Sequence, residues 1–103
     1  MSLDQKVEER REEDVAAAWT EVLGTWAGRL VLWEIMSEAG LFRNPYTGNA
    51  ETNFLCGKQH MAQWIAANLT PDDLFSMQKD HAAFMQDIEN AIKQQEDETD
   101  DAQ

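Results

Sequence analysis

The sequence contains one cysteine, Cys56, among 103 residues, and it has no long apolar run. A single cysteine cannot form an intrachain disulfide, and no cationic, apolar leader follows Met1, so we expect a cytosolic rather than a secreted protein. A membrane-spanning helix needs about 18 consecutive apolar residues. The most apolar stretch, residues 30–36, is interrupted by Glu34, so the sequence predicts no membrane span.

Basic residues are also scarce, since 8 Lys and Arg stand against 20 Asp and Glu and the net charge is −12. Residues 1–14 carry six acids and three bases, residues 15–69 four and three, and residues 70–103 ten and two. Proteins bind nucleic acid mainly through Lys and Arg on the phosphates, so direct nucleic-acid binding is not expected. The charge favours a basic partner surface, although it serves solubility equally well.

The sequence lacks the motifs of common catalytic and metal sites. Cys56 and His60 lie four residues apart, and Asp80 and His81 follow later, but no second paired ligand motif accompanies them. No oxyanion turn or glycine-rich phosphate loop supports a nucleophile or a nucleotide. We interpret Cys56 as a small buried thiol and His81 as a hydrogen-bonded core or edge histidine. The prediction is a protein that is not an enzyme, with no catalytic residues, metal ligands or cofactor.

Apolar residues make up 43% of the chain, with four Trp, four Phe and five Met, enough to build one folded core. Their spacing is helical, and no alternating run bounded by turn signals predicts a strand. The sequence therefore predicts an all-α single domain of about four helices, with a structured loop between the second and third. We divide it into a charged N-terminal helix extension (1–14), a helical domain (15–93) and an acidic disordered tail (94–103).

Three junctions between these helices carry local signals. Gly24-Thr25 favours a break with Thr25 as N-cap, although one kinked helix is the competing interpretation. Gly40 is suited to end the second helix, and either Asn49 or Thr52 could cap the third. Thr70-Pro71 followed by two acids is typical of a helix start.

Two of the predicted helices carry distinctive apolar stripes. In the third, Phe54, Gly57, Met61, Trp64 and Ile65 share one face, and Gly57 implies the close approach of another helix or of the preceding loop. The fourth helix is expected to exceed twenty residues, with one stripe formed by Leu74, Met77, His81, Phe84, Met85, Ile88 and Ile92.

Tryptophans recur every seven residues at Trp19, Trp26 and Trp33. Core packing explains this spacing most simply, but a chain of this size has difficulty burying four indoles. An exposed indole would then anchor a partner or a second copy of the chain, because Trp is enriched at interfaces. The first and fourth helices could also pair between subunits, so a homo-oligomer is possible.

Three linked elements resemble a known family. They are Gly28-Arg29 at the start of a helix with Ala39-Gly40-Leu41-Phe42-Arg43 at its end, the turn Thr47-Gly48-Asn49, and the continuation Phe54-Leu55-Cys56-Gly57-Lys58. Together they are similar to a small tailed-phage domain family typified by a Bordetella podophage protein, over residues 26–80. For Arg29 and Arg43 we favour a structural role, in which they hold the loop through carbonyl or carboxylate bonds.

The resemblance implies a phage protein encoded among capsid and portal genes. The expected function is protein–protein binding as a minor virion or assembly component near the capsid, portal or tail, which includes an internal component that is ejected. Its partners would be portal, scaffold or tail proteins, and its location the host cytoplasm during assembly and then the virion. The alternative is an acidic, DNA-mimicking inhibitor of a host nucleic-acid-binding protein. Candidate partner-binding residues are Trp19, Trp26, Trp33, Arg43 and Tyr46.

Overall fold

A computed structural model describes residues 1–101, which form four α-helices and no strand. The helices are α1 (Leu3–Leu23), α2 (Trp26–Glu38), α3 (Glu51–Ala67) and α4 (Pro71–Asp101). The prediction of a single all-α domain is therefore confirmed. No helix in the described range is both long and apolar enough to cross a membrane.

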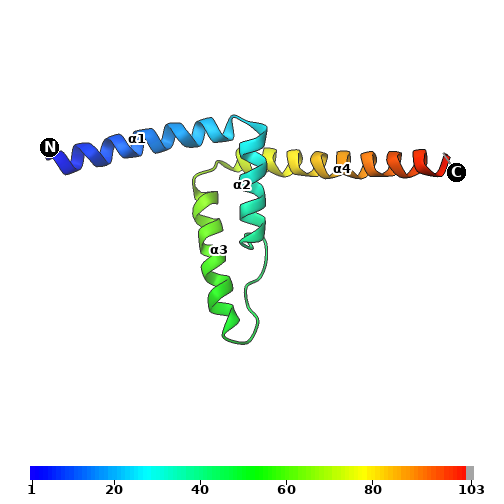
Figure 1. The fold of residues 1–103 in the computed structure, drawn as a ribbon. Coiled ribbons are helices and arrows are strands. Elements are labelled where there is room, and N and C mark those ends of the chain that lie inside the picture. The colour runs from blue at the N-terminus through cyan, green and yellow to red at the C-terminus, as the bar shows by residue number, and fades with distance from the viewer. Residues whose placement is uncertain (102–103) are drawn as a thin grey trace.

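The molecule has the shape of a T (Figure 1). Helices α2 and α3 lie side by side as the stem, while α1 and α4 leave its top in opposite directions and form a bar. The principal extents are 75 × 40 × 21 Å and the radius of gyration is 19.8 Å. A compact domain of this length has a radius of gyration of about 13 Å. The outer halves of α1 and α4 are thus arms that extend away from the rest of the chain.

The helix boundaries predicted at Thr25, Gly40 and Thr70 are confirmed. The Thr25 hydroxyl accepts a hydrogen bond from Gly28 N at 3.0 Å, so α2 begins anew after Gly24 and the alternative of one kinked helix is wrong. Gly40 follows α2 with a φ of 81°, a left-handed conformation that suits glycine. At α4, Thr70 and Asp73 cap one another, each side chain accepting from the other's backbone N–H at 3.0 Å.

Arg29 fixes the centre of the bar. Its Nε donates to Asp80 Oδ2 of α4 at 2.9 Å, and its Nη1 donates to the Leu23 carbonyl at the end of α1, also at 2.9 Å. One side chain of α2 therefore holds both neighbouring helices through a carbonyl and a carboxylate. The role of Arg29 is structural, as predicted, but the prediction that it holds the loop after α2 is wrong, because its partners lie in α1 and α4. Gly28 allows the approach, because a Cβ there would overlap the Val22 carbonyl oxygen.

The core is small. Within residues 1–99, whose side-chain burial is described, four side chains are buried, namely Met36, Ala62, Ile65 and Met77 from α2, α3 and α4. Trp19, Leu32, Trp33, Leu69 and Leu74 are among the half-buried residues packed around them. Burial thus ends close to the junction of the stem and the bar, and neither arm contributes a buried residue beyond it.

The predicted apolar faces are only partly covered. On α3, Ile65 is buried, but Phe54, Met61 and Trp64 are exposed, because α2 packs against the neighbouring face that carries Ala62. Two predictions for α3 are consequently wrong. Cys56 is exposed rather than buried, and no atom lies within 4 Å of the Cβ position of Gly57, so nothing approaches it closely.

Both ends of the chain extend their helices. Ser2 and Gln5 form a capping box for α1, and the charged segment 1–14 is helical with ion pairs Arg10–Asp14 and Arg11–Glu8. Helix α4 continues to Asp101, so residues 94–101 are helical where the sequence predicted a disordered tail; residues 102–103 lie outside the described range. A helix already nucleated at Pro71 gains one hydrogen bond per added residue, and Gln, Glu and Lys are good helix formers, which offsets the repulsion between acids.

Two glycines provide a matched test of this fold. Gly57→Ala adds a methyl group in open space on α3 and is expected to raise the free energy of unfolding by about 1 kcal/mol, the difference in helix propensity. Gly28→Ala is expected to lower it by about 1–3 kcal/mol, because the methyl group displaces the end of α1. Urea unfolding at one protein concentration measures both changes, and a stabilising Gly28→Ala would contradict the described junction.

Candidate partner-binding surfaces

The loop after α2 is held in one shape by one of its own side chains, which binds back to α2, and by one side chain of α3. Arg43 Nη2 donates to the Ser37 carbonyl at 2.7 Å, as the structural role predicted for Arg43 requires. From α3, Gln59 Nε2 donates to the carbonyls of Gly40 at 3.0 Å and Arg43 at 2.7 Å. These bonds satisfy carbonyl groups that follow the end of α2 and fasten the loop to α3.

The second half of the loop forms its own hydrogen-bonded turn. Tyr46 N donates to Asn44 Oδ1 at 3.0 Å, and Thr47 N donates to Thr52 Oγ1 at 3.0 Å. Asn49 Oδ1 accepts from Glu51 N at 2.9 Å in a turn that precedes α3. The N-cap of α3 is Ala50, which offers no side-chain cap, so the prediction of Asn49 or Thr52 as the cap is wrong, and Thr52 instead closes the loop. The loop is therefore structured, as predicted.

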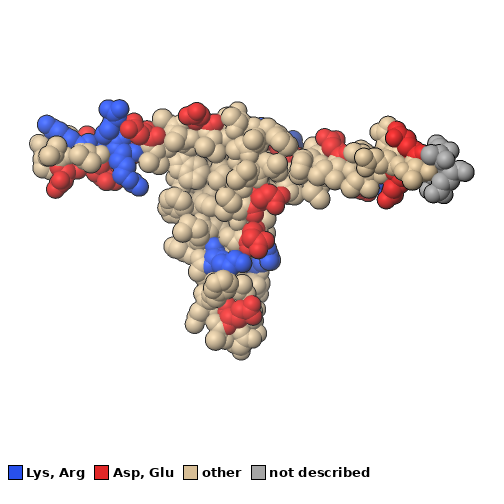
Figure 2. Space-filling view, in the orientation of Figure 1, with Lys and Arg blue, Asp and Glu red and all other residues tan. Residues whose placement is uncertain are grey.

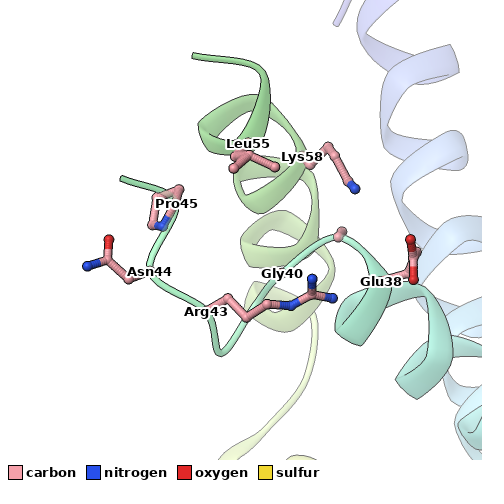
Figure 3. A pocket seen from close by; sticks show the side chains of 8 residues that line it. Glu38, Gly40, Arg43, Asn44, Pro45, Leu55 and Lys58 are labelled. Carbon is pink, nitrogen blue, oxygen red and sulfur yellow. The ribbon is translucent and has the colours of Figure 1, made fainter. Parts of the chain in front are cut away.

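A recess with an empty volume of about 320 Å³ lies between this loop and α3 (Figure 3). Arg43 and Lys58 extend toward the end of α2, where Glu38 lies, while Pro45 and Leu55 supply apolar wall. Within the described part of the chain, neither base has a carboxylate within ion-pairing distance. The recess thus offers two cationic groups beside an apolar wall on a strongly acidic protein.

Three exposed aromatic residues are sequence neighbours of residues that line this recess. Phe42 is 67% exposed, Tyr46 74% and Phe54 65%. Phe42 rests against Trp33, with ring centroids 5.5 Å apart, and Lys58 Nζ lies 5.6 Å from the Phe54 ring centroid. We call the set Phe42, Arg43, Tyr46, Phe54 and Lys58 the stem-end surface.

A second apolar surface lies on the arm formed by α1. A groove with an empty volume of about 450 Å³ is lined by Val15, Ala18, Trp19 and Val22 of α1 together with Leu32 of α2. We call it the arm groove. The Trp19 ring packs edge-on against Trp64 of α3, with centroids 6.2 Å apart, and Met61 and Trp64 are exposed on the same stem helix. Apolar surface thus occurs on both helices that meet at this corner of the T.

A third apolar surface runs along the opposite arm. Phe84 packs edge-on against Trp26 at a centroid distance of 5.6 Å, and Met85, Ile88 and Ile92 are exposed further out on α4. We call Phe84, Met85, Ile88 and Ile92 the α4 stripe. The predicted stripe of α4 is therefore divided, since Met77 is in the core while the α4 stripe is open to solvent.

The candidate residues fall into two groups. Arg43 and Tyr46 belong to the loop of the stem-end surface, where Phe42 rests against Trp33, whereas Trp19 lies in α1 and Trp26 at the start of α2, against Phe84 of α4. Because α2 begins anew at Trp26, the three tryptophans form no continuous stripe. Sequence reasoning missed Phe54, Lys58 and Trp64 as surface residues, although the helical spacing had identified Phe54 and Trp64 as apolar and assigned them to the core.

The residues that the sequence suggested as metal ligands or catalytic groups are divided between α3 and α4. His81 Nε2 lies 3.0 Å from Glu34 Oε1 and against the Trp33 ring, as expected for a hydrogen-bonded edge histidine. Cys56 and His60 are exposed on α3. In the described range, no three His, Cys, Asp or Glu side chains gather closely enough to hold a metal ion.

A comparison with protein families identifies the family of this chain. Residues 19–79 match the family model described as Bbp19-like phage protein. The chain belongs to this family. Searches of curated proteins and of solved structures gave no match.

The residues that match the family model lie mainly in the stem. Residues 19–79 contain the whole stem, the Arg29–Asp80 junction except Asp80 itself, and every residue of the stem-end surface. The match excludes the outer part of α1 and nearly all of the α4 arm. The features shared with other Bbp19-like proteins therefore belong to the stem and its end.

Gln59 can be tested for its hold on the loop. Gln59→Ala removes both bonds to the Gly40 and Arg43 carbonyls, and we expect amide hydrogens of residues 40–46 to exchange at least tenfold faster. Gln63→Ala on the exposed side of α3 is the matched control and should leave the loop unchanged. Equal exchange in the two variants would show that Gln59 does not fix the loop.

Proposed function

We propose that this Bbp19-like phage protein acts by protein–protein binding, without catalysing a reaction, as a minor component of the virion or of its assembly. In this proposal the stem-end surface docks onto a phage structural protein of the portal, scaffold or tail. The observation that carries the proposal is the presence of three highly exposed aromatic rings and two bases on one shaped loop and helix.

The composition of the stem-end surface supports a protein partner. Aromatic residues and Arg are enriched at the energetic centres of protein interfaces, because they bury much area and form directional bonds at little entropic cost. The loop that carries Phe42, Arg43 and Tyr46 is already held by hydrogen bonds, so it would lose little conformational entropy on binding. Arg43 and Lys58 favour an acidic or carbonyl-rich segment on the partner.

The charges of the rest of the molecule suit a place near packaged DNA. Acids and bases alternate on the α1 arm, and acids predominate toward the end of α4, while the stem is largely uncharged (Figure 2). A net charge of −12 disfavours binding to phosphates. The protein could therefore contact a basic face of a structural subunit without being drawn onto the genome.

A second candidate function is supported by the continuation of α4. Because residues 94–99 are helical, Glu96, Asp97 and Glu98 project from a rod rather than a flexible tail. A fixed array of carboxylates is the feature that a DNA-mimicking inhibitor of a host nucleic-acid-binding protein would need. Its binding would weaken strongly with salt and compete with DNA.

Mass spectrometry of purified phage particles separates the two functions. The virion proposal predicts peptides of this protein in virions or procapsids at a fixed ratio to the portal subunit. Absence from both particles, together with salt-sensitive, DNA-competed binding to a host protein, would contradict the virion proposal and favour the inhibitor.

The stem-end surface itself can be tested in the same particles. Phe42→Ala combined with Tyr46→Ala is expected to reduce incorporation more than tenfold, since interface aromatics of this kind contribute about 2 kcal/mol or more each. Phe75→Ala removes an equally exposed ring at the start of α4, outside this surface, and should be incorporated normally. Equal incorporation of both variants would show that the stem-end surface is not the partner-binding surface.

A further inference from the structure

We propose that two copies of the chain form a two-fold dimer in which α1 of each copy packs along the outer part of α4 of the other. The arm groove then receives the α4 stripe of the second copy, twice in one dimer. This inference does not depend on the proposed function, because it rests on the bar of the T and not on the stem-end surface.

The exposed area indicates that a second copy is needed. The chain exposes 7966 Å². A compact monomer of 11.8 kDa exposes about 5,900 Å², so each chain carries an excess of about 2,000 Å². Covering that excess on two chains would bury about 4,000 Å² in total, which falls in the range of obligate homodimers.

Uncovered apolar residues follow helical spacing mainly on the inner half of each arm, whereas residues 8–14 of α1 are all charged and residues 93–101 of α4 are all charged or polar. On α1, Leu3, Val7, Val15 and Val22 are exposed and Ala18 and Trp19 line the arm groove. On α4, the α4 stripe continues the line of core residues beyond the stem. The inner half of each arm, residues 15–22 of α1 and 84–92 of α4, therefore presents a stripe of the width that another helix would cover.

Within one chain the two arms cannot cover each other, since they leave the stem in opposite directions (Figure 1). A two-fold axis perpendicular to the bar at its centre places α1 of one copy beside α4 of the other. The lengths agree: residues 3–19 and 84–101 each span roughly 25 Å at 1.5 Å per residue. The pairing is isologous and closed, so it uses both arms of both copies without generating a filament.

Arg29 sets the register of this pairing. It binds the Leu23 carbonyl and Asp80 at the centre of the bar, so residues equally far outward from these two positions lie opposite one another. Lys6 of one copy then lies near Asp97 of the other. The acidic pairs at 8–9 and 12–13 fall opposite the uncharged residues 94–95 and 90–91. Most like charges therefore avoid each other in this register.

At two places in this register, residues of like charge lie opposite one another. Each of these residues already forms an ion pair within its own helix. Arg10 lies opposite Lys93, and Asp14 lies opposite Glu89. Within its own helix, Arg10 pairs with Asp14 at 3.1 Å and Lys93 pairs with Glu89 at 2.9 Å. Side by side, these two pairs form a four-charge cluster in which each charge has opposite charges as neighbours.

Sedimentation equilibrium of the full chain at about 10 µM tests the stoichiometry. The proposal predicts twice the chain mass of 11.8 kDa, and a monomer at this concentration overturns it. Ile88→Glu combined with Ile92→Glu changes two exposed side chains outside the core and is expected to weaken the dimer at least a hundredfold. Phe54→Glu alters an equally exposed residue at the stem end and should stay dimeric; loss of the dimer in this control alone would place the interface on the stem.

Disulfide trapping tests which arms meet. In a Cys56→Ser background, Val7→Cys together with Glu96→Cys is expected to give a covalent dimer under mild oxidation, because these positions lie opposite each other in the proposed register. Val7→Cys alone should give none, since the two copies of residue 7 lie at opposite ends of the bar. Efficient trapping by Val7→Cys alone would mean that like arms pair, and it would overturn the proposed arrangement.

Discussion

The guanidinium of Arg29 determines the shape of the molecule, because it joins the end of α1, the start of α2 and the middle of the contact with α4. Hydrogen bonds to a charged group contribute about 1.5–3 kcal/mol, a large part of the stability of a small domain. Gly28 makes the contact possible by leaving room for the carbonyl of Val22. Once both helices are held at this point, their arms point apart and cannot fold onto each other or onto the short stem.

The small core follows from this geometry. Among the residues whose burial the structure describes, 1–99, Met36, Ala62, Ile65 and Met77 alone are buried, while apolar side chains continue along the inner part of both arms. A stem of this size buries little surface for a chain of its length, so association through the arms would supply stability that the core lacks. In this account, the arms would join two copies of the chain. The stem end would contact other phage proteins, and it lies inside the Bbp19-like match.

Local signals predicted the helices well, because Thr25, Gly40 and Thr70 act through nearby backbone groups. Periodicity also identified the apolar faces, but it could not say what covers them. Cys56 and Gly57 were therefore assigned to buried positions on a face of α3 that is exposed. The stem-end surface was half predicted through Arg43 and Tyr46, whereas Phe54 and Lys58 join it only because the loop folds back onto α3.

Small-angle X-ray scattering of the intact protein tests the central claim, that opposed arms held at Arg29 leave surface for a second copy. The account predicts a forward-scattering mass of two chains and a bar-shaped particle whose longest dimension is at least the 75 Å of one chain. A single-chain mass with a radius of gyration near 13 Å, the value for a compact monomer with its arms folded in, would contradict it.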